Sequence, residues 1–112
     1  MKKLFAVPVI DGKLCEHFGH CNQFAVVQTE GQRVIKVEFL SPPVHQPGTY
    51  PKFLAEKGVK TIIAGGLGMK AKQIFEQHNI EVIMGVQADK PEVLVESYLQ
   101  HQLVSGENLC DH

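Results

Sequence analysis

Short apolar runs alternate with polar turns along most of the chain, as expected for a sheet with helices packed against it. Residues 4–10 are almost entirely apolar, so we expect a central strand that is buried on both faces. Pro8 cannot donate a hydrogen bond in a sheet, so we expect a bulge or an early end to pairing there. Residues 24–29 and 33–40 form two further strand-like runs, and the glycine-containing connection between them predicts a β-hairpin.

The second half of the chain alternates between helices and strands. Short buried strands are predicted at residues 61–64 and 81–84. Apolar positions at helical spacing predict a helix over residues 69–78, and a shorter helix over residues 52–57 ends at a glycine. A last helix is expected to begin with Asp89 as its N-cap and Glu92 at the capping-box position.

This order of elements restricts the topology. Helix-linked crossovers require the strands at 4–10, 61–64 and 81–84 to be parallel, and the hairpin adds antiparallel strands on the other side of the first strand. We therefore predict an α/β fold with a mixed five-stranded sheet, in the order 3-2-1-4-5 along the chain, and helices on both faces. Residues 1–104 would form a single domain, followed by a flexible tail at 105–112. Strands 1 and 4 would then flank a topological switch point, where ligands favour the carboxyl ends of the strands.

The composition is that of an ordinary globular domain. Hydrophobic residues make up 44% of the chain and charged residues 21%, and 11 basic against 12 acidic residues give a formal charge of −1. This balance gives no indication of nucleic-acid binding, and the longest apolar run is too short to span a membrane. No signal-peptide pattern is present, so a cytoplasmic location is expected. Three cysteines in a reducing compartment favour metal or redox chemistry over a disulfide framework.

The stretch CEHFGHC, residues 15–21, follows the first predicted strand and holds the densest chemistry in the chain. Thiolate and imidazole are ligands of zinc, copper and iron–sulfur units. The spacing contains neither CxxC nor HxxxH, so a closed zinc site is disfavoured. The alternative is a turn with a buried Phe18, a solvated histidine and inert buried thiols. The candidate metal ligands in this stretch are Cys15, His17, His20 and Cys21.

The C-terminal CDH repeats the Cys-x-His spacing of the first two ligands, so Cys110 and His112 are further candidates. Ten extended residues span up to about 33 Å, which would bring the tail back to its own cleft or to that of a neighbour. We predict a tail that metal binding orders, with a frayed terminus as the alternative.

The glycine-rich turn GGLG, residues 65–68, lies between a predicted strand and a predicted helix. Its backbone N–H groups at a helix N-terminus would favour an anion. The same residues begin a GxGxxA match, so a nucleotide-dependent redox enzyme is an alternative. However, the next strand ends at Met84 and Gly85, where the ribose-binding acid of a dinucleotide site belongs, and we favour a generic anion contact.

Taken together, AVPV at residues 6–9 with the following DG, HFG at 17–19 and GGLG at 65–68 resemble the dinitrogenase iron–molybdenum cofactor biosynthesis family. The resemblance covers nearly the whole chain up to the last helix. It implies a three-layer ribonuclease H-like fold without a nuclease site, and cluster binding or transport during assembly of the nitrogenase cofactor for nitrogen fixation. The cluster contacts that it implies are His17, Phe18, Gly19, Gly65, Gly66 and Gly68. The additional thiols and imidazoles are not part of the family pattern.

We therefore expect a small cytoplasmic protein that is not an enzyme and that binds or carries a metallocluster. Its cofactor would be an iron–sulfur or iron–molybdenum type cluster. Its partners would be that cluster or the proteins that donate or accept it, with no nucleic acid and no membrane, and it would be a monomer or a weak homodimer. The alternatives are the nucleotide-dependent redox enzyme and a metal-free interaction domain.

Overall fold

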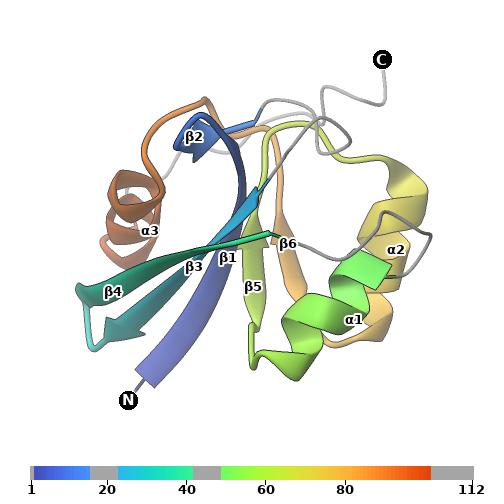
Figure 1. Cartoon of the computed structure of the whole chain (residues 1–112), viewed down its shortest axis with the longest axis horizontal. Helices are drawn as coiled ribbons and strands as arrows, with labels where there is room; N and C mark the ends of the chain where they lie inside the picture. Colours follow the sequence, from blue (N-terminus) through green and yellow to red (C-terminus); the bar gives the residue numbers. More distant parts are fainter. Residues whose placement is uncertain (1, 16–22, 42–48, 102–112) are drawn as a thin grey trace.

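The computed structural model describes residues 2–15, 23–41 and 49–101, which form an α/β domain (Figure 1). The predicted tail at 105–112 lies outside these residues. No helix within the described ranges is long and apolar enough to cross a membrane. The elements, in chain order, are β1 (Lys2–Ile10), β2 (Lys13–Leu14), β3 (Gln23–Glu30), β4 (Arg33–Leu40), α1 (Thr49–Glu56), β5 (Thr61–Ile63), α2 (Met69–Gln77), β6 (Glu81–Ile83) and α3 (Pro91–Leu99).

The described strands form one mixed sheet in the order β4-β3-β1-β5-β6, with β2 paired to β1 off this path. Strand β1 is parallel to β5, and β5 is parallel to β6, whereas β3 is antiparallel to both β1 and β4. The prediction of a five-stranded sheet was wrong in its count, because the described residues contribute six strands to the sheet. The additional strand is β2.

The turn between β1 and β2 explains this sixth strand. Asp11 and Gly12 both have positive φ, at 54° and 83°, as the two central residues of a type I′ turn do. Such a turn reverses the chain at once, so that Ile10 pairs with Lys13 and Val9 with Leu14. The Asp-Gly pair was therefore a hairpin signal, although the strand that it introduces is short.

Pro8 lies inside β1, where the sequence suggested a bulge or an early end to pairing. The expectation of a bulge was wrong, because pairing with β3 continues through Pro8 to Val9. Parallel pairing with β5, by contrast, reaches only Ala6. The carbonyl of Pro8 accepts a 2.9 Å hydrogen bond from the backbone N–H of Cys15. Since the N and O of one strand residue point to the same side, the donor that proline lacks would face Cys15, beyond the last residue of β1 that pairs with β5.

Helices cover both faces of the sheet, with α3 on one side and α1 and α2 on the other (Figure 1). Alternate residues of β1 point into two separate cores, because successive side chains of a strand face opposite ways. Towards α3, the core comprises Phe5, Val7, Val9, Leu14, Ala25, Val27, Ile63, Val86, Leu94 and Val95. Towards α1 and α2, it comprises Ala6, Phe24, Val26, Leu54, Val59, Ile62, Leu67, Phe75 and Ile80.

The start of α3 differs from the prediction by one residue. The N-cap is Lys90 rather than Asp89, and no side-chain capping bond is made there. Instead, Asp89 accepts a 2.7 Å hydrogen bond from the backbone N–H of Lys90 through its Oδ1. Pro91 then occupies the first turn, where its missing N–H costs nothing.

Candidate functional site

The carboxyl ends of β1, β5 and β6 lie at the same edge of the sheet, because the three strands run parallel. We call this the carboxyl edge. From β1 the chain turns into β2, whose Leu14 packs in the core beneath α3. From β5 it passes into α2, which lies on the opposite face (Figure 1). The two connections therefore diverge between β1 and β5, as the predicted switch point requires.

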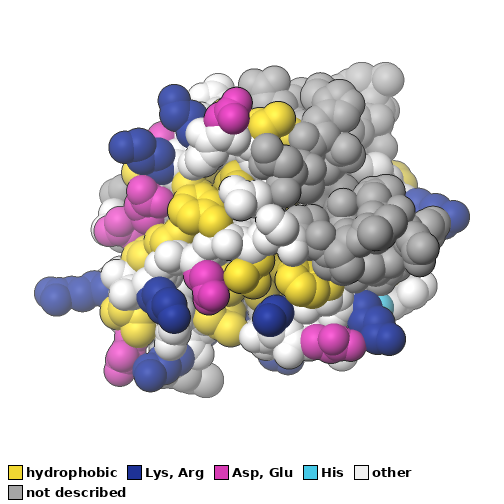
Figure 2. All heavy atoms as spheres, viewed as in Figure 1, with side chains coloured by type: hydrophobic (Ala, Val, Ile, Leu, Met, Phe, Trp, Pro, Cys, Tyr) yellow, Lys and Arg dark blue, Asp and Glu magenta, His cyan; other side chains and the backbone are white. Residues whose placement is uncertain are grey.

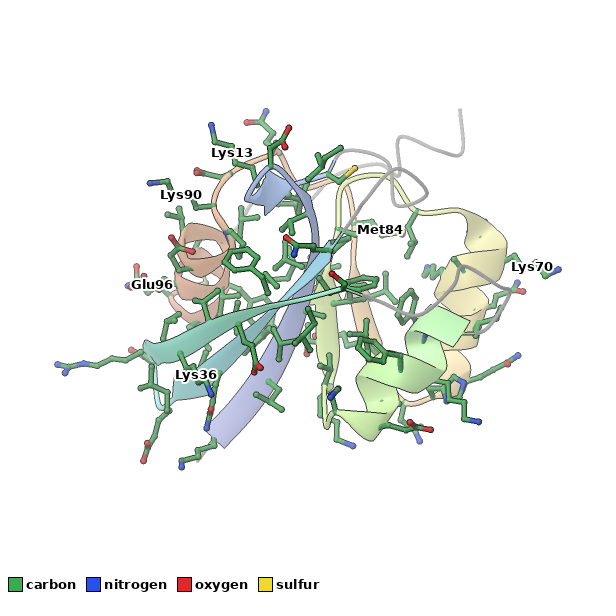
Figure 3. The ribbon with its side chains drawn as sticks, in the orientation of Figure 1. Lys13, Lys36, Lys70, Met84, Lys90 and Glu96 are labelled. Atoms are coloured by element: carbon green, nitrogen blue, oxygen red, sulfur yellow. The ribbon has the colours of Figure 1, made fainter. Side chains whose placement is uncertain are left out.

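Backbone hydrogen bonds extend the pairing of β5 and β6 beyond the strands. Ala64 donates to the carbonyl of Ile83 at 2.8 Å, and Gly85 donates to that of Gly65 at 2.8 Å. Residues 64–67 are all buried. Met84 lies half-buried just after β6, at the same edge of the sheet (Figure 3). The first part of the glycine turn is thus fixed in place, and the N-terminus of α2 follows it directly.

Gly68 is the N-cap residue of α2 and is exposed. Its φ of −64° and ψ of 150° are open to any residue, so the backbone does not require glycine. A Cβ built on Gly68 would meet no atom within 4 Å, so the described packing does not require glycine either. A glycine that neither conformation nor packing demands is consistent with close approach of a ligand to the backbone.

The N-terminus of α2 also has the electrostatic character of an anion contact. Its N-cap has no side chain to accept from the N–H groups of the first turn, and the first turn contains no acidic residue. The partial positive charge of a helix N-terminus favours negative charge at this position. Lys70 in this turn is exposed and lies on the outer side of α2 (Figure 3).

Cys15 follows β2 at the carboxyl edge and is buried, with 5% of its surface exposed. Two backbone hydrogen bonds fix its position. Its own N–H donates to Pro8, and the N–H of Leu14 donates at 3.0 Å to the carbonyl of Asp89, before α3. The structure thus places a thiol near the ends of the strands, inside the surface rather than on it.

The remaining predicted ligands lie outside the described residues, so the metal site stays a prediction. Within the described ranges, no group of three or more His, Cys, Asp or Glu side chains is arranged to hold a metal ion. Those ranges supply the thiol of Cys15 and the backbone N–H groups of the glycine turn. A complete donor set would need residues from 16–22 or 102–112. The predicted site residues that lie there are His17, Phe18, Gly19, His20, Cys21, Cys110 and His112.

The opposite end of the sheet carries a groove that the sequence did not indicate. It has a volume of about 700 Å³ and is lined by Lys2, Lys3, Lys60 and Tyr98, among others. Tyr98 donates a 2.9 Å hydrogen bond from its hydroxyl to Oε1 of Glu81. Burial raises the pKa of Tyr98, and the bond to Glu81 and its negative charge raise it further. Because this groove is lined mainly by surface side chains, we favour the carboxyl edge as the candidate site.

The fold and this edge define a class of small α/β domains in which a fixed glycine turn follows one parallel strand and a buried thiol follows the β1–β2 hairpin. Comparisons with known proteins identify the family. The sequence model of the "Dinitrogenase iron-molybdenum cofactor" family matches residues 1–101. The chain therefore belongs to the dinitrogenase iron–molybdenum cofactor family.

Several individual proteins are similar to this chain. The uncharacterized protein MJ0580 of Methanocaldococcus jannaschii is 32% identical over 82 residues, which cover 69% of this chain and 70% of that protein. The crystal structure of PH0822 has a TM-score of 0.83 at 27% identity, and the match covers 91% of this chain and 93% of the other. The apo form of the orange protein from Desulfovibrio gigas has a TM-score of 0.74 at 22% identity, covering 95% and 94% of the two chains. This last likeness shows the fold alone.

Proposed function

We propose that this protein binds a metallocluster as cargo at the carboxyl edge, as a carrier or accessory in cofactor assembly rather than as an enzyme. Membership of the dinitrogenase iron–molybdenum cofactor family supports a role connected with that cofactor. The backbone N–H groups of the glycine turn would contact the anionic surface of an iron–sulfur or iron–molybdenum type cluster. The metal would be held by thiolate and imidazole groups.

The observation that carries the proposal is Gly68. Serine is a better N-cap than glycine, since its hydroxyl accepts from the N–H groups of the first turn. The conformation and surroundings of Gly68 would both admit serine. Glycine at this position therefore caps the helix less well than serine would. It also keeps the N–H groups of the first turn available to an external acceptor.

Cys15 supplies the second part of the proposed site. A cluster ligand must be deprotonated, and a thiolate close to the surface is stabilised when it bonds to metal. In the proposal His17, His20 and Cys21 complete the donor set, since they follow Cys15 directly in the chain. Cys110 and His112 are assigned to the same site as additional ligands.

Molybdate is a suitable probe of the anion contact, because it is an oxyanion that does not require a complete cluster site. Calorimetric titration of wild type should give binding that Gly68→Ser weakens at least tenfold, because the new hydroxyl competes for the same N–H groups. The matched control is Lys90→Ser, which places serine at the N-cap of α3 and should leave affinity unchanged. Equal affinity in wild type and Gly68→Ser would overturn the role of the turn.

The same titration separates the carrier from the nucleotide-dependent enzyme. NAD should bind more weakly than molybdate, because Met84 and Gly85 stand where a ribose-binding acid is expected. A micromolar dissociation constant for NAD, equivalent to about −8 kcal/mol, would favour the enzyme instead.

A further inference from the structure

Strand β4 ends the sheet, and no strand in the described part of the chain pairs with its outer side. Figure 2, drawn from the same side as Figure 1, shows hydrophobic side chains gathered on the face where β4 lies in front, with basic and acidic side chains between them. A strand edge with unpaired N–H and C=O groups is a template for pairing with another strand.

The exposed apolar residues of β4 are large. Ile35 is 49% exposed and Phe39 is 45% exposed. Val37 lies between them and is half-buried. Ile35 falls at a register shift between β3 and β4, and regular pairing resumes at Lys36 and continues to Leu40. The outer edge of this regular run is therefore able to continue the sheet.

The charges of β4 are self-complementary about Val37. Lys36 and Glu38 flank it, and both are exposed. If two copies of β4 pair antiparallel with Val37 opposite Val37, each Lys36 lies opposite Glu38 of the second copy, and each Ile35 lies opposite Phe39. Registers centred on Lys36 or on Glu38 would instead place two like charges face to face, which destabilises a strand pair.

We propose that two copies of this chain associate through β4 in the register centred on Val37, which joins their sheets into one continuous sheet. A lysine in the middle of an edge strand normally prevents such pairing. Here the glutamate of the second copy neutralises it, and the two-fold axis repeats the ion pair. Strand β4 lies two strands away from β1 and on the far side of it from β5, so this interface is independent of the function proposed for the carboxyl edge.

Sedimentation velocity over a range of concentrations tests the interface. Wild type should show a concentration-dependent dimer, and Lys36→Glu and Glu38→Lys should each weaken it by about tenfold, because two attractive pairs become two repulsive ones. Mixing the two variants should restore a dimer of wild-type strength. In the mixed dimer one strand carries glutamate at both flanking positions and the other carries lysine at both, so every facing pair is again attractive.

The controls are Lys13→Glu and Glu96→Lys, whose side chains lie away from Lys36 in the fold (Figure 3). Each control, and their mixture, should behave as wild type. Rescue by mixing also establishes that both β4 variants are folded. A wild type that remains monomeric at about 1 mM, or a pair of β4 variants that mixing does not rescue, would overturn the proposal.

Discussion

The hydroxyl of Tyr98 donates a 2.9 Å hydrogen bond to Oε1 of Glu81, which ties α3 to the first residue of β6. The ring of Tyr98 also packs edge-on against Phe5, with centroids 5.4 Å apart. Both contacts lie at the end of the sheet opposite the candidate site. Changes at Tyr98 should therefore affect stability without affecting ligand binding.

This bond predicts an alkaline loss of stability. The pKa of Tyr98 is raised by burial and by Glu81, so the folded state holds the phenolic proton more tightly than the unfolded state does. The resulting stabilisation is complete below the ordinary pKa near 10 and is lost as the pH rises through the higher folded-state pKa. Urea unfolding of Tyr98→Phe should show a free energy lower by about 0.5 kcal/mol at pH 7 and a shallower decline above about pH 10.

The matched variant for this prediction is Glu81→Gln, which keeps an acceptor oxygen but removes the negative charge. It should retain most of the stability at pH 7 and show a smaller alkaline decline than wild type. Parallel declines in all three proteins would exclude Tyr98 as the source.

The strands of the sheet were predictable where their apolar pattern was long. Residues 4–10 form most of β1 because an uninterrupted apolar run suits a strand that is buried on both faces. Strand β2 was missed because two residues carry no periodicity, and only the Asp-Gly turn indicates it. The cap of α3 was misplaced by one residue because Asp89 and Lys90 both precede Pro91 and the pattern does not choose between them.

The sequence predicted the glycine turn between a strand and a helix, but not the backbone conformation within it; the ligand set remains a prediction. The glycine turn follows from the sequence, since GGLG separates a strand from a helix. Cys15 is buried next to a hydrogen bond between Leu14 and Asp89, and because these two residues are distant in the chain, no local pattern contains this contact. Likewise, the sequence does not reveal that Gly68 has a backbone conformation open to any residue, because this depends on how the turn folds.

Cys15 should contribute to both stability and cluster uptake. Since its side chain is 5% exposed, Cys15→Ala removes buried volume and should lower the free energy of unfolding by about 1 kcal/mol. Cys15→Ser should cost more, because it buries a hydroxyl in place of a thiol. Chemical unfolding of the empty proteins measures both values.

The role of Cys15 as a ligand is tested separately by the metal content of the same variants after anaerobic reconstitution. Loss of metal in both Cys15→Ala and Cys15→Ser is the expected result. Destabilisation with full metal content would make Cys15 a packing residue only.

If the C-terminal residues are metal ligands, the tail should affect the affinity for metal but not the stability of the empty protein. Deletion of residues 106–112 removes Cys110 and His112, so the metal should bind more weakly, while the melting temperature of the empty protein should not change. Isothermal titration with the reconstituting metal and a thermal melt measure the two quantities. Unaltered affinity after the deletion would assign the site to the loop alone.

The most direct measurement is metal and acid-labile sulfide analysis of the protein purified without oxygen, together with its visible absorption spectrum. We predict bound metal with a charge-transfer band in wild type, and their loss in the double variant His17→Ala, Cys21→Ala, whose circular dichroism should match wild type. The variant His101→Ala, on an exposed residue after α3, should keep the metal. Wild type without metal after reconstitution, or a double variant that retains it, would contradict the proposed cluster site.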